Sequence, residues 1–164
     1  MRITSDVPGI DAADLRRMLS GLPDARGYRV AAKPLRDRSR PHLAAWTDFE
    51  QRQITLQVPE PFVPFGEVVP YAAQRRPGKG LRFIWLSEGI TFRTPREVLR
   101  FLYLHEWMHW YLKEVLGTRS AAETACDRFA LRNYRRRAVT VEQALEALRR
   151  SPRGTGLPAS PRAV

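Results

Sequence analysis

Apolar residues recur every three or four positions between Thr94 and Gly117, and this spacing predicts the longest helix of the chain. Thr94 at the N-cap, Pro95 at the first helical position and Glu97 form the pattern of a capping box with a helix-compatible proline. Gly117 is typical of a helix C-terminus. The predicted apolar face consists of Val98, Phe101, Leu102, His105, His109, Leu112 and Leu116. Two of the three histidines of the chain therefore share one apolar face.

Shorter elements are predicted on both sides of this helix. Capping residues and helix breakers predict helices at about 11–20, 121–137 and 140–150. Alternating β-branched and apolar residues predict strands at 28–35 and 81–89 and a hairpin within 42–59, whose second strand, 54–58, we expect at a sheet edge. Frequent prolines and glycines in 59–80 exclude a long helix or central strand and predict a long surface loop. Together these elements predict an α+β fold with a small antiparallel or mixed sheet beside a helix pair.

The length of 164 residues and the apolar fraction of 43% suit a single globular domain, which we place at residues 1–150. Residues 151–164 are rich in Pro, Gly, Ser and Arg and are expected to form a disordered tail. No apolar run approaches the roughly 20 residues that cross a bilayer, and the N-terminal segment lacks the apolar stretch of a signal peptide. Cys126 is the only cysteine, so no internal disulfide can form. We therefore expect a cytoplasmic protein without a membrane partner.

Basic residues outnumber acidic residues by 28 to 17, which gives a formal net charge of +11. Such an excess attracts nucleic acid or an acidic partner. The cationic residues are nearly all arginine and are spread along the chain, a pattern that general arginine usage also produces. The charge therefore predicts no more than a weak association with nucleic acid through an arginine-rich surface.

The segment from His105 to His109, HEWMH, matches the pattern H-E-x-x-H on the predicted helix. Residues at i and i+4 point the same way from a helix, so the two imidazoles can bind one zinc ion. Glu106 lies beside such a metal and can accept a proton from water that the metal has made more acidic. The alternative interpretation is a pair of ordinary helix histidines at the edge of a core, with Glu106 exposed to solvent.

A catalytic zinc needs a third protein ligand, and the candidates are His42, Glu123, Cys126 and Asp127. Glu123 and Asp127 are four residues apart on a predicted helix that a short turn folds back against the first. We expect Glu123 to bind the metal and Asp127 to hold a ligand histidine in a fixed tautomer without touching the metal itself. Alternatively, Ser120 and Glu123 form a capping box and Asp127 pairs with an arginine.

The motif H-E-W-M-H followed by E-T-A-C-D-R-F-A resembles the gluzincin arrangement of metallopeptidases, and more closely the small ImmA/IrrE family. The similarity covers about residues 94–131. It implies a minimal zincin-like domain in which His105, His109 and Glu123 bind zinc, Glu106 is the general base and Asp127 orients a ligand. The resulting prediction is a zinc-dependent metallopeptidase that hydrolyses peptide bonds of a protein substrate.

The competing prediction is a nucleic-acid- or protein-binding module whose metal site is structural or absent. Its contacts would come from the basic end of the helix predicted at 121–137, at Arg132, Arg135, Arg136 and Arg137. For the peptidase, Tyr111, Tyr134, His42 and the nearby arginines are candidate hydrogen-bond donors to the oxyanion. The residue types alone do not choose among them.

Overall fold

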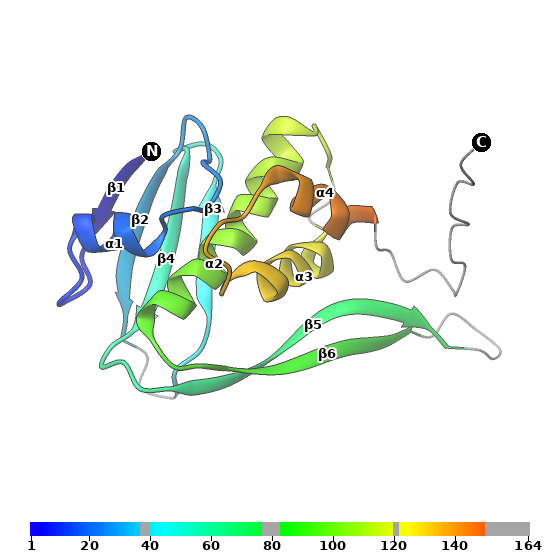
Figure 1. Cartoon of the computed structure of the whole chain (residues 1–164), viewed down its shortest axis with the longest axis horizontal. Coiled ribbons are helices and arrows are strands. Elements are labelled where there is room, and N and C mark those ends of the chain that lie inside the picture. Colours follow the sequence, from blue (N-terminus) through cyan, green and yellow to red (C-terminus); the bar gives the residue numbers. More distant parts are fainter. Residues whose placement is uncertain (37–39, 77–82, 120–121, 150–164) are drawn as a thin grey trace.

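The structure is a computed structural model and describes residues 1–36, 40–76, 83–119 and 122–149. These residues form an α+β fold, as predicted (Figure 1). The strands are β1 (Arg2–Ser5), β2 (Arg29–Leu35), β3 (Ala44–Asp48), β4 (Gln53–Pro59), β5 (Phe65–Arg75) and β6 (Phe83–Phe92). The helices are α1 (Ala12–Met18), α2 (Pro95–Trp110), η1 (Tyr111–Val115), α3 (Glu123–Asn133) and α4 (Val141–Arg149). None of the described helices has both the length and the apolar character needed to span a membrane. The tail predicted at 151–164 lies outside the described residues.

The larger sheet is mixed and has the strand order β1-β2-β4-β3. Strands β1, β2 and β4 run parallel, and β3 pairs antiparallel with β4 in the predicted hairpin. The prediction that residues 54–58 form an edge strand was wrong, because β4 pairs with β2 on one side and with β3 on the other. Ile54, Thr55 and Leu56 are fully buried, as expected for an inner strand. The edge strand of this hairpin is β3, and it contacts α2.

The second sheet is a two-stranded antiparallel ribbon of β5 and β6 that runs alongside α3 (Figure 1). The prediction of a surface loop at 59–80 was wrong for residues 65–75, while residues 77–80 lie outside the described part of the chain. Pro70 is tolerated because both strands of a ribbon are edge strands, and the pairing register shifts between Pro70 and Ala72. Strand β6 also continues beyond residue 89, the predicted end of this strand, to Phe92.

Helix α2 begins as predicted. The Thr94 side chain accepts a hydrogen bond from the backbone N–H of Glu97 at 3.3 Å, and Glu97 Oε2 accepts one from the backbone N–H of Arg93. The α-helical part ends at Trp110, and the π-helical turn η1 then carries the chain toward Gly117, whose φ is +62°. The apolar side chains of the predicted face are buried except Leu116, which is 40% exposed because it follows this wider turn.

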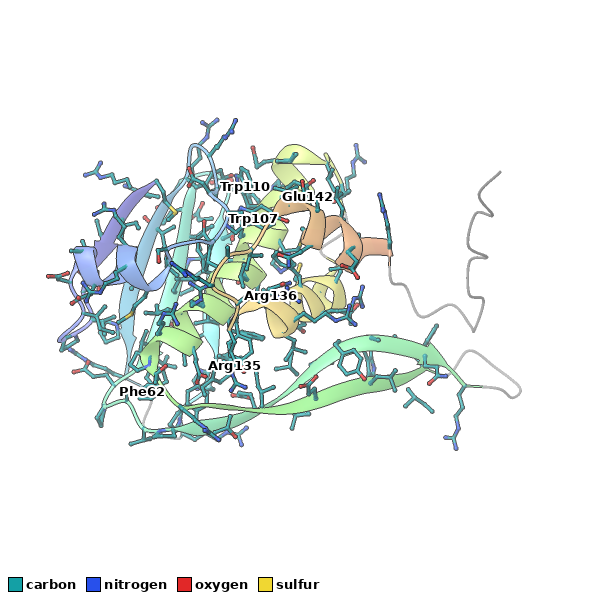
Figure 2. All side chains as sticks on the ribbon, viewed as in Figure 1. Phe62, Trp107, Trp110, Arg135, Arg136 and Glu142 are labelled. Atoms are coloured by element: carbon teal, nitrogen blue, oxygen red, sulfur yellow. The ribbon has the colours of Figure 1, made fainter. Side chains whose placement is uncertain are left out.

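Helix α3 is shorter than the predicted span of 121–137. Its N-cap is Ala122, which has a left-handed conformation and no side-chain capping hydrogen bond. Ser120, the alternative cap considered from the sequence, lies outside the described residues. Arg135 and Arg136 follow the end of α3 (Figure 2). Most of the arginines of the competing prediction therefore do not lie on a helix.

Side chains cap the two short helices where the sequence predicts their starts. In α1, Asp11 and Asp14 form a reciprocal capping box. Before α4, the backbone N–H of Thr140 donates to Oε1 of Gln143 at 2.9 Å. Both contacts satisfy backbone groups that a helix start leaves without an intrahelical partner.

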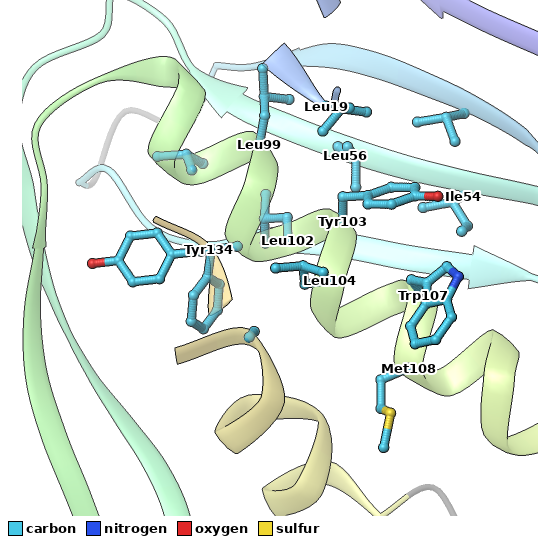
Figure 3. Packing of buried hydrophobic residues seen from close by; sticks show 14 of the residues in the cluster. Leu19, Ile54, Leu56, Leu99, Leu102, Tyr103, Leu104, Trp107, Met108 and Tyr134 are labelled. Atoms are coloured by element: carbon cyan, nitrogen blue, oxygen red, sulfur yellow. The ribbon is translucent and has the colours of Figure 1, made fainter. Parts of the chain in front are cut away.

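Helix α2 lies within the hydrophobic core, between the larger sheet and α3 (Figure 3). Leu99, Tyr103, Leu104 and Met108 have no exposed surface, and Trp107 is 1% exposed. The indoles of Trp107 and Trp110, with Glu142 at the start of α4, line a hollow of about 540 Å³ (Figure 2). The aromatic residues around the motif are therefore core residues, and the histidines are carried by a helix that packing holds on several sides.

A buried arginine joins α2 to the segments around it. Arg100 has no exposed surface, and its guanidinium donates to the backbone carbonyls of Met18, Ser20, Tyr134 and Arg136. These four acceptors belong to the end of α1 and to the segment after α3. The guanidinium thus fixes α2 relative to both, which limits how far α2 and α3 can separate.

Candidate metal centre

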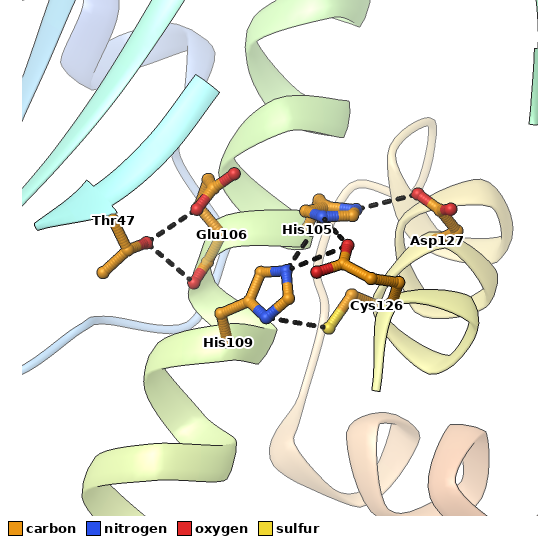
Figure 4. A network of polar contacts seen from close by, with 7 residues as sticks. Thr47, His105, Glu106, His109, Cys126 and Asp127 are labelled. Carbon is orange, nitrogen blue, oxygen red and sulfur yellow. Dashed lines mark hydrogen bonds and ion pairs between the residues drawn. The ribbon is translucent and has the colours of Figure 1, made fainter. Parts of the chain in front are cut away.

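Two helices bring three potential metal ligands together (Figure 4). His105 and His109 project from one face of α2, and Glu123 is the first residue of α3. The Nε2 atoms of the two histidines are 3.0 Å apart, and Oε2 of Glu123 lies 3.3 Å from that of His105 and 3.4 Å from that of His109. Within the described part of the chain, these three residues form the group whose ligand atoms converge.

The separations between these atoms fit one zinc ion. Zinc binds imidazole nitrogen at about 2.0–2.1 Å and carboxylate oxygen at about 2.0–2.2 Å, usually with tetrahedral geometry, so neighbouring ligand atoms are roughly 3.3–3.5 Å apart. The two separations to Glu123, 3.3 and 3.4 Å, fall in this range, and the nitrogen pair at 3.0 Å is slightly closer. The three atoms thus match one face of a zinc tetrahedron, whose fourth corner is the position for water or substrate.

The other ring nitrogens of the histidines face side chains of α3. Nδ1 of His105 lies 2.8 Å from Oδ1 of Asp127, the contact by which a carboxylate fixes the tautomer of a ligand histidine. Nδ1 of His109 lies 3.6 Å from Sγ of Cys126. With Nδ1 held in this way, the Nε2 atom of each histidine faces the Glu123 carboxylate. Cys126 and Asp127, considered as ligands from the sequence, therefore contact the Nδ1 atoms of the histidines and not the Nε2 atoms that converge with Glu123.

The carboxylates of α3 change the protonation of this group. Burial lowers the pKa of His105, but hydrogen bonds to Asp127 and Glu123 outweigh burial and raise it to about 9. The pKa of Glu123 lies below its usual value, chiefly because His105 hydrogen-bonds its carboxylate. Burial, with the nearby charges of Glu123 and Asp127, raises the pKa of the Cys126 thiol. Without a metal, the group therefore holds a proton at neutral pH that a cation can replace.

Glu106 lies against the larger sheet. It is 6% exposed, so it does not lie in solvent, and its Oε2 accepts a hydrogen bond of 2.7 Å from the Thr47 hydroxyl of β3 (Figure 4). The same hydroxyl lies 3.4 Å from the backbone carbonyl oxygen of Glu106. Sequence reasoning missed Thr47, which is 59 positions from Glu106 along the chain. The only available signal was the alternation of β3, which places Thr47 on the same face as Ala45.

The remaining candidates from the sequence do not join this group. Nδ1 of His42 lies 3.2 Å from the backbone carbonyl oxygen of Arg40, in the segment before β3. The Tyr111 ring stacks on Trp107, and Tyr134 is 4% exposed within a cluster of phenylalanines. Both tyrosines are therefore core residues.

The chain matches no protein-family model, no curated protein and no solved structure. The resemblance to the ImmA/IrrE family accordingly stays a prediction. The evidence for a function therefore lies in the geometry of His105, His109 and Glu123 and in the buried Glu106 beside them.

Proposed function

We propose that the protein is a zinc-dependent metallopeptidase with a minimal zincin-like domain and a protein or peptide substrate. The observation that supports it best is the convergence of three atoms, Nε2 of His105, Nε2 of His109 and Oε2 of Glu123, at separations of 3.0–3.4 Å. Ordinary helix histidines need neither a carboxylate from a second helix nor a buried glutamate between them. The zinc-site interpretation accounts for both.

The ligands and their support have distinct roles. His105, His109 and Glu123 would hold the ion, and bound zinc supplies a Lewis acid that acidifies water and polarises a carbonyl group. Asp127 accepts a hydrogen bond from Nδ1 of His105, which leaves the lone pair of that histidine on Nε2. Cys126 occupies the corresponding position at His109. The helix pair thus presents both imidazoles in the orientation that metal binding requires.

Glu106 is the general base of the proposed reaction. The Thr47 hydroxyl occupies Oε2 of Glu106, so Oε1 is the atom that accepts a proton from the attacking water. The resulting carboxylic acid then gives that proton to the amine that leaves when the peptide bond breaks. Thr47 limits rotation of the carboxylate, which keeps Oε1 in one position through both transfers.

Strand β3 is the proposed binding edge for an extended peptide. It is one of the two edge strands of the larger sheet, and no described strand pairs with its outer side. A peptide that adds to an edge strand gains backbone hydrogen bonds whatever its sequence. Because Thr47 of β3 contacts Glu106, such a peptide would pass beside the catalytic carboxylate.

Metal content tests the proposal. Purified protein exposed to zinc and freed of excess should hold about one ion per chain by elemental analysis. His109→Ala and Glu123→Ala should lose the ion because each removes a ligand, whereas Glu106→Gln should keep it. His42→Ala is the matched control, since it removes the histidine outside the group. A wild-type protein that binds no stoichiometric zinc would overturn the proposal.

A second experiment tests the reaction. Zinc-loaded protein is incubated with a proteome-derived peptide library, and new termini are identified by mass spectrometry. The wild type should create new termini, and Glu106→Gln should create none while holding the same amount of zinc. Cleavage that persists in Glu106→Gln would remove this residue from the mechanism. Zinc binding without cleavage by the wild type would favour the competing binding module with a structural metal.

A further inference from the structure

The larger sheet has a second face, which we call the outer face, that points away from α1 and α2. Ile3, Val30 and Ile54 belong to the core, so their neighbours along each strand point the opposite way. Residues paired in register share a face, which places Arg2 beside Arg29 on the outer face. Both arginines are exposed, as is Lys33, four residues beyond Arg29 on the same side of β2. The outer face is therefore polar and basic.

At one end of the outer face, three arginines surround a hollow of about 580 Å³. Arg2, Arg29 and Arg52 line it with Tyr28 and Gln51, and no carboxylate lines it. None of these three arginines forms an ion pair with a described residue, whereas three other exposed arginines each pair with a carboxylate. The hollow thus gathers three arginines that have no ion-pair partner among the described residues, while Glu114 and Asp48 hydrogen-bond Tyr28 and Gln51 of its lining.

The arrangement of these arginines is unfavourable without a bound anion. Arg2 and Arg29 are direct neighbours on parallel strands that lie about 4.8 Å apart, and like charges so placed repel each other. Arg52 has φ 50°, in the left-handed region that residues other than glycine rarely adopt. Backbone strain of this kind is often found at ligand sites. An anion between the guanidinium groups offsets the repulsion and uses the side-chain position that the strained turn creates.

An exposed tryptophan stands on the same face. Trp46 is 45% exposed, and it pairs in register with Thr55, which points outward with Ala31 and Thr4. From strand spacing and rise, the Cα atom of Trp46 lies about 12 Å from that of Arg29. Thr55 and Ala31 between them are buried, and the Gln53 side chain donates a hydrogen bond to the Thr55 hydroxyl, so the exposed indole is the surface on which a planar group can stack.

We propose that the outer face binds single-stranded nucleic acid, with phosphates in the hollow between Arg2, Arg29 and Arg52 and a base stacked on Trp46. The formal net charge of +11 favours the approach of a polyanion. A duplex hides the faces of its bases and cannot use the indole, and a free polyphosphate uses the arginines alone. Asp48, an acid on the same face, opposes phosphate binding there. The proposal does not depend on the metal centre.

Fluorescence anisotropy with labelled oligo(dT) and oligo(U) of about 12 nucleotides tests the proposal, and the two probes distinguish DNA from RNA. The wild type should bind with an affinity that falls as salt rises. The triple variant Arg2→Gln/Arg29→Gln/Arg52→Gln should reduce the slope of log affinity against log salt by about 2, at about 0.7 per phosphate contact. Trp46→Ala should weaken binding by about 5- to 150-fold, the measured range for one stacked base.

The matched control is Arg16→Gln/Arg96→Gln/Arg149→Gln, which removes the same charge from exposed arginines on three helices and should keep nearly wild-type affinity. An equal loss in both triple variants would overturn the site, because it would show non-specific attraction. Unchanged binding by Trp46→Ala, or equal affinity for a duplex or for pyrophosphate, would also overturn it.

Arg52→Gly should weaken binding without lowering Tm, since glycine tolerates the left-handed turn. A loss of both binding and Tm would assign Arg52 a structural role instead.

Discussion

Zinc binding should release a proton from His105. The pKa of this residue predicts how many protons are released per zinc ion. Burial lowers the pKa of His105, and hydrogen bonds to Asp127 and Glu123 outweigh this and raise it to about 9. At pH 7 a group with this pKa is about 99% protonated. Zinc binds only the neutral imidazole, so binding at pH 7 should displace about one proton from this residue.

The same proton sets the pH dependence of zinc affinity. Between pH 7 and pH 8 the apparent affinity should rise about tenfold, or about 1.4 kcal/mol, because each pH unit removes most of the competing protonation. The rise should flatten above about pH 9, where His105 is largely neutral without metal. Glu123 adds nothing to this slope, since its lowered pKa keeps it ionised throughout the range.

Calorimetry in buffers of different ionisation enthalpy counts the protons, and competition with a chelator gives the affinity at each pH. Asp127→Asn is the informative variant, because it removes the charge that raises the pKa of His105. It should release fewer protons at pH 7 and bind zinc about 10- to 100-fold more weakly. Zinc binding without proton release at pH 7, or an affinity that stays constant from pH 7 to pH 8, would refute the assignment of His105 as a ligand held by Asp127.

Three further predictions concern stability, each measured by urea unfolding. In the metal-free protein, the raised pKa of His105 contributes at most about 3 kcal/mol, which is fully present below about pH 6.5 and lost as pH rises through about 9; a flat profile would contradict it. Thr47→Val leaves the buried Glu106 carboxylate without this donor and should lower the free energy of unfolding by about 1–3 kcal/mol, whereas Thr47→Ser should retain most of it. Arg100→Lys should lower the free energy of unfolding by about 2–4 kcal/mol, because one ammonium group cannot reach four separated carbonyls. Unchanged stability would argue that the four hydrogen bonds of Arg100 do not hold α2 in place.

The residues of the candidate metal centre could be predicted because their spacing is local. His105 and His109 share a helix face through their separation of four residues, and the same separation relates Glu123 to Asp127. The capping residues at Thr94 fixed where the helix that carries both histidines begins, so both histidines could be placed on it. The distance between the two helices depends on packing and on buried contacts such as those of Arg100, which residue type alone would place at the surface.

Features that depend on pairing between distant segments were not predicted. Strand β1 has four residues, of which only Ile3 is core, so it carries no periodic pattern. The prolines of residues 59–80 indicated a loop because proline is excluded from inner strands, but that exclusion does not apply to a ribbon such as β5 and β6. The contact of Thr47 with Glu106 requires both the hairpin register and the position of α2, and neither follows from local spacing.

Strand β3 separates metal binding from catalysis in the proposed enzyme. The zinc ligands come from α2 and α3 alone, whereas the base is positioned by Thr47 of β3, so a change in β3 can alter catalysis without releasing the metal. The register of β3 places Thr47 toward Glu106 and its neighbour Trp46 on the outer face; a shift of one residue would exchange them. The turn that sets this register contains the left-handed Arg52, which also lines the basic hollow. Because the hairpin turn fixes strand pairing, the conformation of Arg52 contributes both to the contact of Thr47 with Glu106 and to the position of the charge on the outer face.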